Sequence, residues 1–196
     1  VVNDNGGTAL ACAWTMNVTG TPHASLTGTE SPGLTVFLSP DTPYDVTESG
    51  PTGYSASSST DCSSTTGIPA GQTRTCTFTN DDKPAHLKLV KKVINDNGCT
   101  AVATDWTLTA DGAKDYSGAG GFDLDVDADT YALSESTGPA GYKAGSFDCG
   151  VSVTLALGES KTCEITNDDI TAHLKLVKKV INDSGGKAVA TDWTLT

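Results

Sequence analysis

Three polar side chains fall on strand faces that the sequence otherwise fills with apolar residues. In three stretches, apolar residues recur at every second position, as expected for half-buried strands. The inward set of each stretch includes one polar residue, which is Lys91, Glu135 or Asn167. Burying a lysine, a glutamate and an asparagine separately would cost several kcal/mol each. The pattern therefore predicts that an amine, a carboxyl group and a carboxamide meet inside the fold. An error of one position in the register would instead turn Lys91 outward to solvent.

Four of the six cysteines are spaced equally in the two halves of the chain. Cys62 and Cys76 are 14 positions apart, and so are Cys149 and Cys163. The spacing predicts two disulfides, each closing a hairpin, and a loop of this size stabilises by roughly 3 kcal/mol. Disulfides indicate an oxidising location outside the cytoplasm. The alternative is pairs of reduced, buried thiols. Zinc is disfavoured because the sequence has no close set of Cys and His residues.

The remaining two cysteines, Cys12 and Cys99, do not occupy equivalent positions in the two halves of the chain. Cys12 alternates with Trp14 and Met16 and is expected to point into the core, whereas Cys99 replaces a turn glycine and is expected to be exposed. An exposed, unpaired cysteine suggests a bond to another chain. The alternative is one buried and one exposed free thiol.

An internal repeat sets the organisation of the chain. The segment AHLKLVKKVIND occurs at residues 85–96 and again, unchanged, at 172–183. A remnant of it, VVND, stands at residues 1–4. Each copy precedes a glycine turn and a tryptophan, and the sequence between copies ends on a cysteine strand followed by Asn-Asp-Asp. The protein is therefore expected to be a series of similar modules.

The modules are expected to be β-sandwiches. Module one covers residues 1–82, module two covers 83–169, and 170–196 hold the first strands of a third module. Frequent alternation, with Gly, Pro, Asn and Asp between the runs, is typical of all-β, immunoglobulin-like antiparallel sandwiches of about seven strands. Short polar joints between modules predict a semi-rigid rod.

Composition and charge exclude several classes of function. The net charge of −12 argues against nucleic acid as a partner, and no apolar run is long enough to span a membrane. The sequence starts without an initiator Met or a signal peptide, which suggests a mature or excised portion of a protein. The alternating Asp residues at 123–129 are expected to form a solvated acidic face, so no metal and no cofactor is expected. Asn17 and Asn182 fit the acceptor pattern for N-glycosylation.

Three motifs, repeated in the same order, resemble those of a known family. They are the lysine-bearing first strand at 85–96, the segment Tyr131–Glu135 with the Gly-Tyr turn that follows it, and the Thr-Asn end of the last strand at 163–167. Together they resemble the Cna B-type, prealbumin-like (SpaA-like) domain of Gram-positive pilins and surface adhesins. The resemblance covers essentially the whole chain, and it implies a prealbumin-like sandwich.

The resemblance also implies an intramolecular isopeptide bond. In that family a lysine amine attacks an asparagine amide while a glutamate assists proton transfer. Lys91 would be the nucleophile, Asn167 the electrophile and Glu135 the catalyst. Burial lowers a lysine pKa and raises a glutamate pKa, so that a neutral amine meets a polarised carbonyl. The bond would form once, and the chain is not expected to be an enzyme. Ser136 stands where the family usually has Thr, and a buried Lys–Glu ion pair capped by the Asn amide is the alternative.

Module one lacks the strand that would precede Val1, which suggests head-to-tail assembly. An unpaired sheet edge recruits a strand, and residues 170–183 carry a copy of the one that is missing. Donation of this strand to module one of another copy would place Lys178 opposite Glu48 and Asn80. The alternative is a polypeptide that continues in both directions as a longer array.

These expectations favour a structural subunit of an extracellular filament, pilus or cell-surface stalk, whose partners are copies of itself. Modules that are copied almost unchanged serve length better than recognition. The alternative is an adhesin that binds a glycan or a protein ligand through the loops of module one. Module one is the more divergent module, and Arg74 is its only Lys or Arg residue.

Overall fold

The computed structural model describes residues 1–20 and 25–196, and its strands confirm the all-β prediction. No α-helix occurs in this part of the chain. The described residues of module one form six strands and two 3-10 helices: η1 (Ala11–Ala13), β1 (Thr15–Val18), β2 (Leu26–Thr27), β3 (Tyr44–Ser49), β4 (Tyr54–Ser58), η2 (Thr60–Cys62), β5 (Ser63–Ser64) and β6 (Phe78–Asp82).

Module two is the more complete sandwich, with eight strands where about seven were expected. Its elements are β7 (Ala85–Ile94), η3 (Ala103–Asp105), β8 (Thr107–Asp111), β9 (Tyr116–Ala119), β10 (Gly121–Val126), β11 (Thr130–Glu135), β12 (Tyr142–Lys143), β13 (Ser152–Thr154) and β14 (Ser160–Asp169). They form two sheets, ordered β10-β7-β14-β12 and β13-β11-β8-β9. Residues 170–196 contain only the 3-10 helix η4 (Ala190–Asp192).

One strand pair departs from the antiparallel expectation. β7 and β14, the first and last strands of module two, are parallel, with Ile165 opposite Lys91 and Asn167 opposite Val93. Alternation shows which residues face inward but carries no information on strand direction. Parallel first and last strands bring the chain in at one end of the module, here called the upper end, and out at the opposite, lower end. The topology is therefore suited to joining modules in a line.

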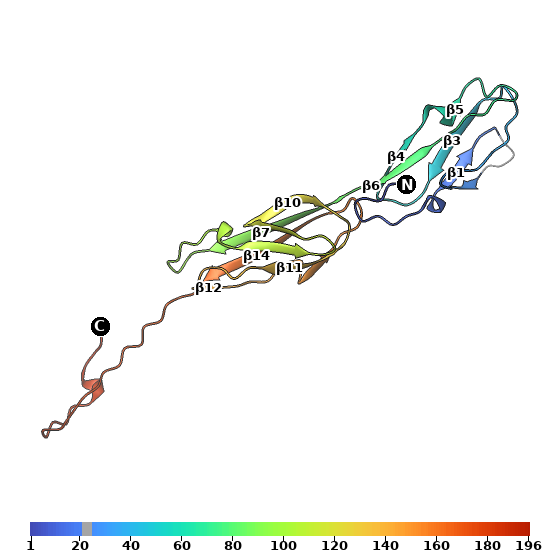
Figure 1. The fold of residues 1–196 in the computed structure, drawn as a ribbon. Coiled ribbons are helices and arrows are strands. Elements are labelled where there is room, and N and C mark those ends of the chain that lie inside the picture. The colour runs from blue at the N-terminus through green and yellow to red at the C-terminus, as the bar shows by residue number, and fades with distance from the viewer. Residues whose placement is uncertain (21–24) are drawn as a thin grey trace.

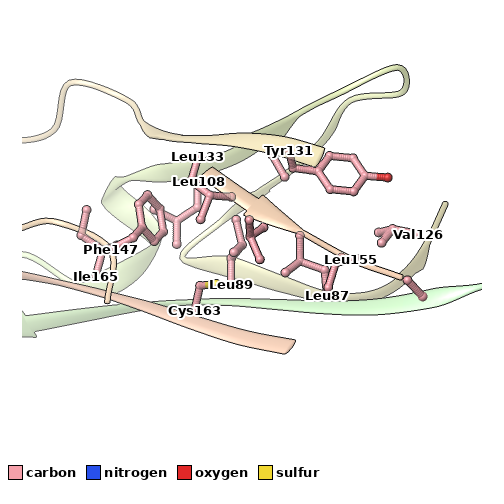
Figure 2. Packing of buried hydrophobic residues seen from close by; sticks show 13 residues of the cluster. Leu87, Leu89, Leu108, Val126, Tyr131, Leu133, Phe147, Leu155, Cys163 and Ile165 are labelled. Atoms are coloured by element: carbon pink, nitrogen blue, oxygen red, sulfur yellow. The ribbon is translucent and has the colours of Figure 1, made fainter. Parts of the chain in front are cut away.

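The core of module two lies between its two sheets. β7 contributes Leu87 and Leu89, β14 contributes Cys163 and Ile165, and Figure 2 shows these side chains packed against Leu108, Tyr131, Leu133, Phe147 and Leu155. Leu87 is fully buried and Leu89 is 2% exposed. Since each buried side chain of this size contributes about 1.5–3 kcal/mol, the apolar positions of β7 supply a large part of the stability of the module.

Module one has an open sheet edge at the corresponding place. β6 pairs with β4 on one side, and on the other side the described residues offer only an isolated bridge between Val2 and Asp81. Residues 28–43, which precede β3 as β10 precedes β11, contain no strand. Leu34 and Phe37 in this segment are 57% and 84% exposed. In module two, β7 pairs with both β10 and β14, so a strand beside β6 would occupy the corresponding place in module one.

The two modules lie end to end, and residues 170–196 extend away from the lower end of module two (Figure 1). At the joint, the Ala128 N–H donates to the carbonyl of Asn5 at 2.8 Å. The Lys83 N–H donates to the carbonyl of Gly53 at 2.9 Å. None of the helices among the described residues has the length and apolar character needed to cross a membrane.

Candidate functional site

The three inward polar residues of module two come together at one place between the sheets. β7 supplies Lys91, the last residue of β11 is Glu135, and β14 supplies Asn167. Lys91 Nζ forms an ion pair with Glu135 Oε1, and Asn167 Nδ2 donates to Glu135 Oε2 at 2.9 Å. The side chain of Lys91 is fully buried and that of Glu135 is 9% exposed. Glu135 thus touches both the amine and the carboxamide.

Two further contacts fix the orientation of this cluster. Lys91 Nζ lies 4.8 Å from the centre of the Trp106 ring, which favours a cation electrostatically. The backbone N–H of Gly145 donates to Asn167 Oδ1 at 3.1 Å, so that a hydrogen-bond donor already polarises the amide carbonyl. A charge that develops on this oxygen during attack at the carbonyl carbon would be stabilised by the same donor.

The surroundings of Lys91 make its amine easier to deprotonate than a lysine in water. Burial lowers the pKa of Lys91, and the hydrogen bond and charge of Glu135 offset this only in part. A neutral lysine is a nucleophile, whereas its protonated form is not. A cleft of about 660 Å³ is lined by Trp106, Glu135 and Asn167, among others, and would give ammonia a way out. The site can therefore act either as a buried ion pair or as the precursor of an amide bond.

Module one contains the same site without its lysine. Asn80 is 5% exposed, and its Nδ2 donates to Glu48 Oε1 at 2.6 Å, which matches the contact between Asn167 and Glu135. No ion pair between Glu48 and a lysine occurs among the described residues. Residues 170–196, which include Lys178, extend away from the end of module two that is opposite module one (Figure 1). Lys178 Nζ lies 4.4 Å from the Trp193 ring, so the tail keeps the Lys–Trp contact of module two.

The structure pairs Cys62 with Cys76 and Cys149 with Cys163 as disulfides. Their Cα–Cα separations are 4.5 and 5.5 Å, within the range that a disulfide can bridge. Cys149–Cys163 ties the loop before β13 to the middle of β14, two residues before Ile165.

The expectation that Cys12 points into the core is wrong. Cys12 is exposed, because residues 11–13 form the 3-10 helix η1 and the alternating strand begins only after Trp14. Cys99 is partly exposed. Both are unpaired in this structure.

A buried aspartate at the end of each module was missed by the sequence analysis. Asp169 is 4% exposed and accepts hydrogen bonds from the backbone N–H groups of Asp96, Asn97 and Cys99 at 2.9–3.0 Å. Asp82 does the same for Asp4, Asn5 and Gly7 in module one. The last Asp of each Asn-Asp-Asp sequence was the available signal. In each module this aspartate anchors the turn that follows the position of the first strand.

These hydrogen bonds change the ionisation of the carboxyl group. Burial alone would raise the pKa of Asp169, but the donated hydrogen bonds from Cys99, Asn97 and Asp96 outweigh it and hold the pKa below its usual range. The pKa of Asp82 is lowered for the same reason.

Module two is therefore expected to lose stability in acid. The folded-state pKa of Asp169 is lower than the unfolded-state value of about 3.9, so its ionisation stabilises the fold above that value. The contribution is lost as the pH falls through the folded-state pKa. Thermal unfolding of wild type and Asp169→Asn from neutral to strongly acidic pH would measure this. The variant should show the smaller loss, and Asp168→Asn, at the exposed neighbouring position, should behave as wild type. Equal acid sensitivity in wild type and Asp169→Asn would contradict the assignment.

The remaining predicted sites lie outside the buried cluster. Asn17 is partly buried in β1, and Asn182 is exposed in the tail. Asp123 and Asp125 on β10 are engaged by β7, since His86 Nε2 and Nδ1 bond to them at 2.6 and 2.8 Å. Lys88 Nζ bonds to Asp123 at 2.8 Å. The hydrogen bonds to Asp125 and Asp123 raise the pKa of His86. Asp123 and Asp125 therefore connect β10 to β7, whereas Asp127 and Asp129 follow the end of β10.

A comparison with protein families matches nearly all of the chain. The model of the prealbumin-like fold domain matches residues 1–78, 82–165 and 169–196 in succession. The chain belongs to the prealbumin-like fold domain family. This confirms the resemblance inferred from the three motifs.

Solved structures similar to this prealbumin-like chain include pilins and adhesins. The C-terminal fragment of the pilus adhesin SpaC from Lactobacillus rhamnosus GG is 14% identical with a TM-score of 0.45, and 89% of this chain and 97% of the fragment are covered. The Bacillus anthracis TIE protein is 14% identical with a TM-score of 0.44, over 86% of this chain and 33% of that protein. A major pilin protein from Streptococcus pyogenes is 13% identical with a TM-score of 0.34, over 87% of this chain and 94% of the pilin. No curated protein sequence matches the chain.

Proposed function

We propose that this chain is a structural segment of an extracellular filament, pilus or cell-surface stalk. The observation that carries the proposal is the parallel pairing of β7 with β14, which lets a module receive the chain at one end and release it at the other. The disulfides favour a location outside the cytoplasm. The modules provide length and resist unfolding, and turnover chemistry has no part in the proposal. Electron microscopy of the polypeptide of residues 1–196 should reveal rod-shaped particles with the two modules in a line, singly or joined end to end, and compact, rounded particles at every concentration would contradict it.

The buried cluster of module two is proposed to mature into a covalent cross-link. Lys91 Nζ would form an amide bond with the side-chain carbonyl carbon of Asn167, the bond from that carbon to Nδ2 would break, and ammonia would leave. Glu135, which contacts both partners, would carry protons from the amine to the leaving nitrogen. The support is the shared contact with Glu135, the lowered pKa of Lys91 and the donor on Asn167 Oδ1.

The intact mass of the chain tests this cross-link. We expect the mass to be lower than the sequence mass by one ammonia for module two, after correction for the disulfide hydrogens. Asn167→Ala should abolish the loss, because it removes the leaving group. Asn95→Ala should keep it, because Asn95 lies outside the cluster. An unchanged wild-type mass would show that the three side chains form only an ion pair and hydrogen bonds.

Strand addition is the proposed mode of head-to-tail assembly. Leu174, Leu176 and Val177 in the tail are 85%, 57% and 74% exposed. The first two correspond to Leu87 and Leu89, which are buried in module two. A tail strand beside β6 of another copy would bury Leu174 and Leu176 and cover Leu34 and Phe37. It would also bring Lys178 to Glu48 and Asn80, where a second isopeptide bond would link the chains.

An adhesin is the second candidate, favoured by the exposed Leu34 and Phe37 of module one. An exposed apolar patch marks an interaction site of some kind. A screen of glycans and surface proteins against the 1–196 chain would identify a ligand of this patch. Binding that persists in assembled filaments would favour recognition, whereas loss of the exposed patch on assembly would favour the structural role.

A further inference from the structure

The joint between modules one and two depends on a glycine turn that meets a second turn face to face. Gly53 has φ +86, and a Cβ built on it would lie 2.6 Å from Leu157 Cβ. The residue that leaves module one, Lys83, donates its N–H to the Gly53 carbonyl at 2.9 Å and accepts from the N–H of Gly158 at 3.2 Å. The contact thus joins the lower end of module one, at residues 50–54, to the upper turn of module two, at 156–159. Only glycine allows the two backbones to approach so closely.

The lower end of module two repeats this glycine turn, and its outer side is open. Gly141 has φ +90, and the Ile170 N–H donates to its carbonyl at 2.9 Å, as Lys83 donates to Gly53. Tyr142 packs edge-on against Trp106 at 5.2 Å, as Tyr54 packs against Trp14 at 5.1 Å. The only described atom within 4 Å of a Cβ built on Gly141 is Cys99 Sγ, at 3.6 Å. The turn is therefore held in the geometry of a joint before any partner is present.

The upper end of module one carries the matching turn. The Gln72 N–H donates to the Pro69 carbonyl at 3.1 Å, and the Glu159 N–H donates to the Ala156 carbonyl at 3.0 Å in module two. Gly71 has φ +78 and Gly158 has φ +70, so the two turns have the same form. A Cβ on Gly71 would meet none of the described atoms within 4 Å. Ala70 takes the place of Leu157 and is exposed.

We propose that the glycine turn at residues 138–142 is a docking site for the turn at 69–72 of a second copy of this chain. The proposal rests on the head-to-tail function and adds a contact to it that is separate from the donated strand. In the docked pair, Gly141 faces Ala70 and the Ile170 carbonyl accepts from the Gly71 N–H, as in the internal joint. The tail at 172–181 leaves this contact in the direction of the open edge beside β6. Docking therefore sets the position from which the strand is donated.

The docked contact is weaker than the internal joint for two reasons that the structure shows. In the internal joint the Ala128 N–H donates to the Asn5 carbonyl, and the equivalent residues of the docked pair are Asp41 and Asn97. The Asp41 N–H already donates to the Ile68 carbonyl at 3.0 Å, so it is not free to donate to Asn97. Ala70 also presents a smaller apolar surface than Leu157 does. Replacing Ala70 with leucine, the residue at the equivalent position 157, should therefore strengthen the contact.

Cys99 reports directly on this docking site, because its Sγ lies beside the open face of Gly141. Alkylation of assembled 1–196 chains, followed by peptide mass spectrometry, gives the rates at Cys99 and at Cys12. Cys12 is exposed in η1 and serves as the internal control. The Leu176→Asp variant is the unassembled reference, because it is expected not to donate its strand. The ratio of the alkylation rate at Cys99 to that at Cys12 should be about tenfold lower in assembled wild type than in this variant. Ala70→Leu should tighten association about fivefold, and Ala70→Asp should weaken it and expose Cys99.

The outcomes separate docking from strand donation. If chains assemble but Cys99 stays as reactive as in Leu176→Asp, and both Ala70 variants associate as wild type, the docking site is wrong while head-to-tail assembly stands. If neither wild type nor Ala70→Leu associates at any concentration, both proposals are overturned. Protection of Cys99 that follows the order Ala70→Leu, wild type, Ala70→Asp supports the docking site.

Discussion

Replacing Lys91 with methionine is expected to lower the free energy of unfolding of module two by about 3–5 kcal/mol. The substitution keeps an unbranched chain of similar length against Trp106 but leaves Glu135 as a buried carboxylate with no cationic partner. It also removes the nucleophile, so the chain would keep its full mass. Hydrogen exchange by mass spectrometry would report the change, since it resolves the amides of β7 and β14 from those of module one.

Lys92 provides the matched control for this prediction. It lies next to Lys91 on the same strand but faces solvent, where its amine pairs with Glu164. Lys92→Met should cost under about 1 kcal/mol, as for other exposed ion pairs. The double variant Lys91→Met/Glu135→Gln should recover part of the stability, because it removes the unpaired charge. Equal effects of Lys91→Met and Lys92→Met would show that the buried cluster does not support the module.

The positions of Lys91, Glu135 and Asn167 could be predicted because each breaks an alternating apolar pattern. Alternate residues of a strand face opposite sides of the sheet, so the face that a residue occupies can be read from the sequence. The same rule gave a wrong prediction for Cys12, because residues 11–13 form a 3-10 turn and the alternation of strand residues does not extend to it. It also could not give the parallel direction of β7 and β14. The repeated Asn-Asp-Asp sequence marks Asp169 as a candidate but does not give its role, because its partners, around residues 96–99, lie more than 69 positions away in sequence.

The two copies of the twelve-residue repeat show what sequence alone leaves undecided. Residues 85–94 form the ten-residue strand β7, whereas the identical residues 172–181 form no strand. The difference lies in their neighbours, since β7 pairs with β10 and β14 and the tail has no sheet beside it. Strand structure in this sequence is therefore conferred by a partner edge. A segment with this property forms a strand only beside a partner edge, as the proposed strand donation requires.

Replacing Leu176 with aspartate is expected to weaken assembly of the 1–196 chain at least about 100-fold. Leu176 corresponds to Leu89, which is 2% exposed in module two. Donation would bury it in the core of module one, where an aspartate would lose the apolar gain and pay for desolvation. The folding of the single chain should be unaffected, because Leu176 is 57% exposed in the tail.

Lys175→Asp is the control for this last experiment. Lys175 corresponds to Lys88, which faces outward on β7, so its replacement should change association less than about tenfold. Sedimentation velocity over a concentration series would compare wild type with both variants. If Leu176→Asp assembles as readily as wild type, the tail does not enter an apolar core. The tail would then have to associate through its polar face, and the larger effect would come from Lys175→Asp. The order of the two variants thus shows which face of the donated strand is buried, and with it whether the β7 register is reproduced between chains.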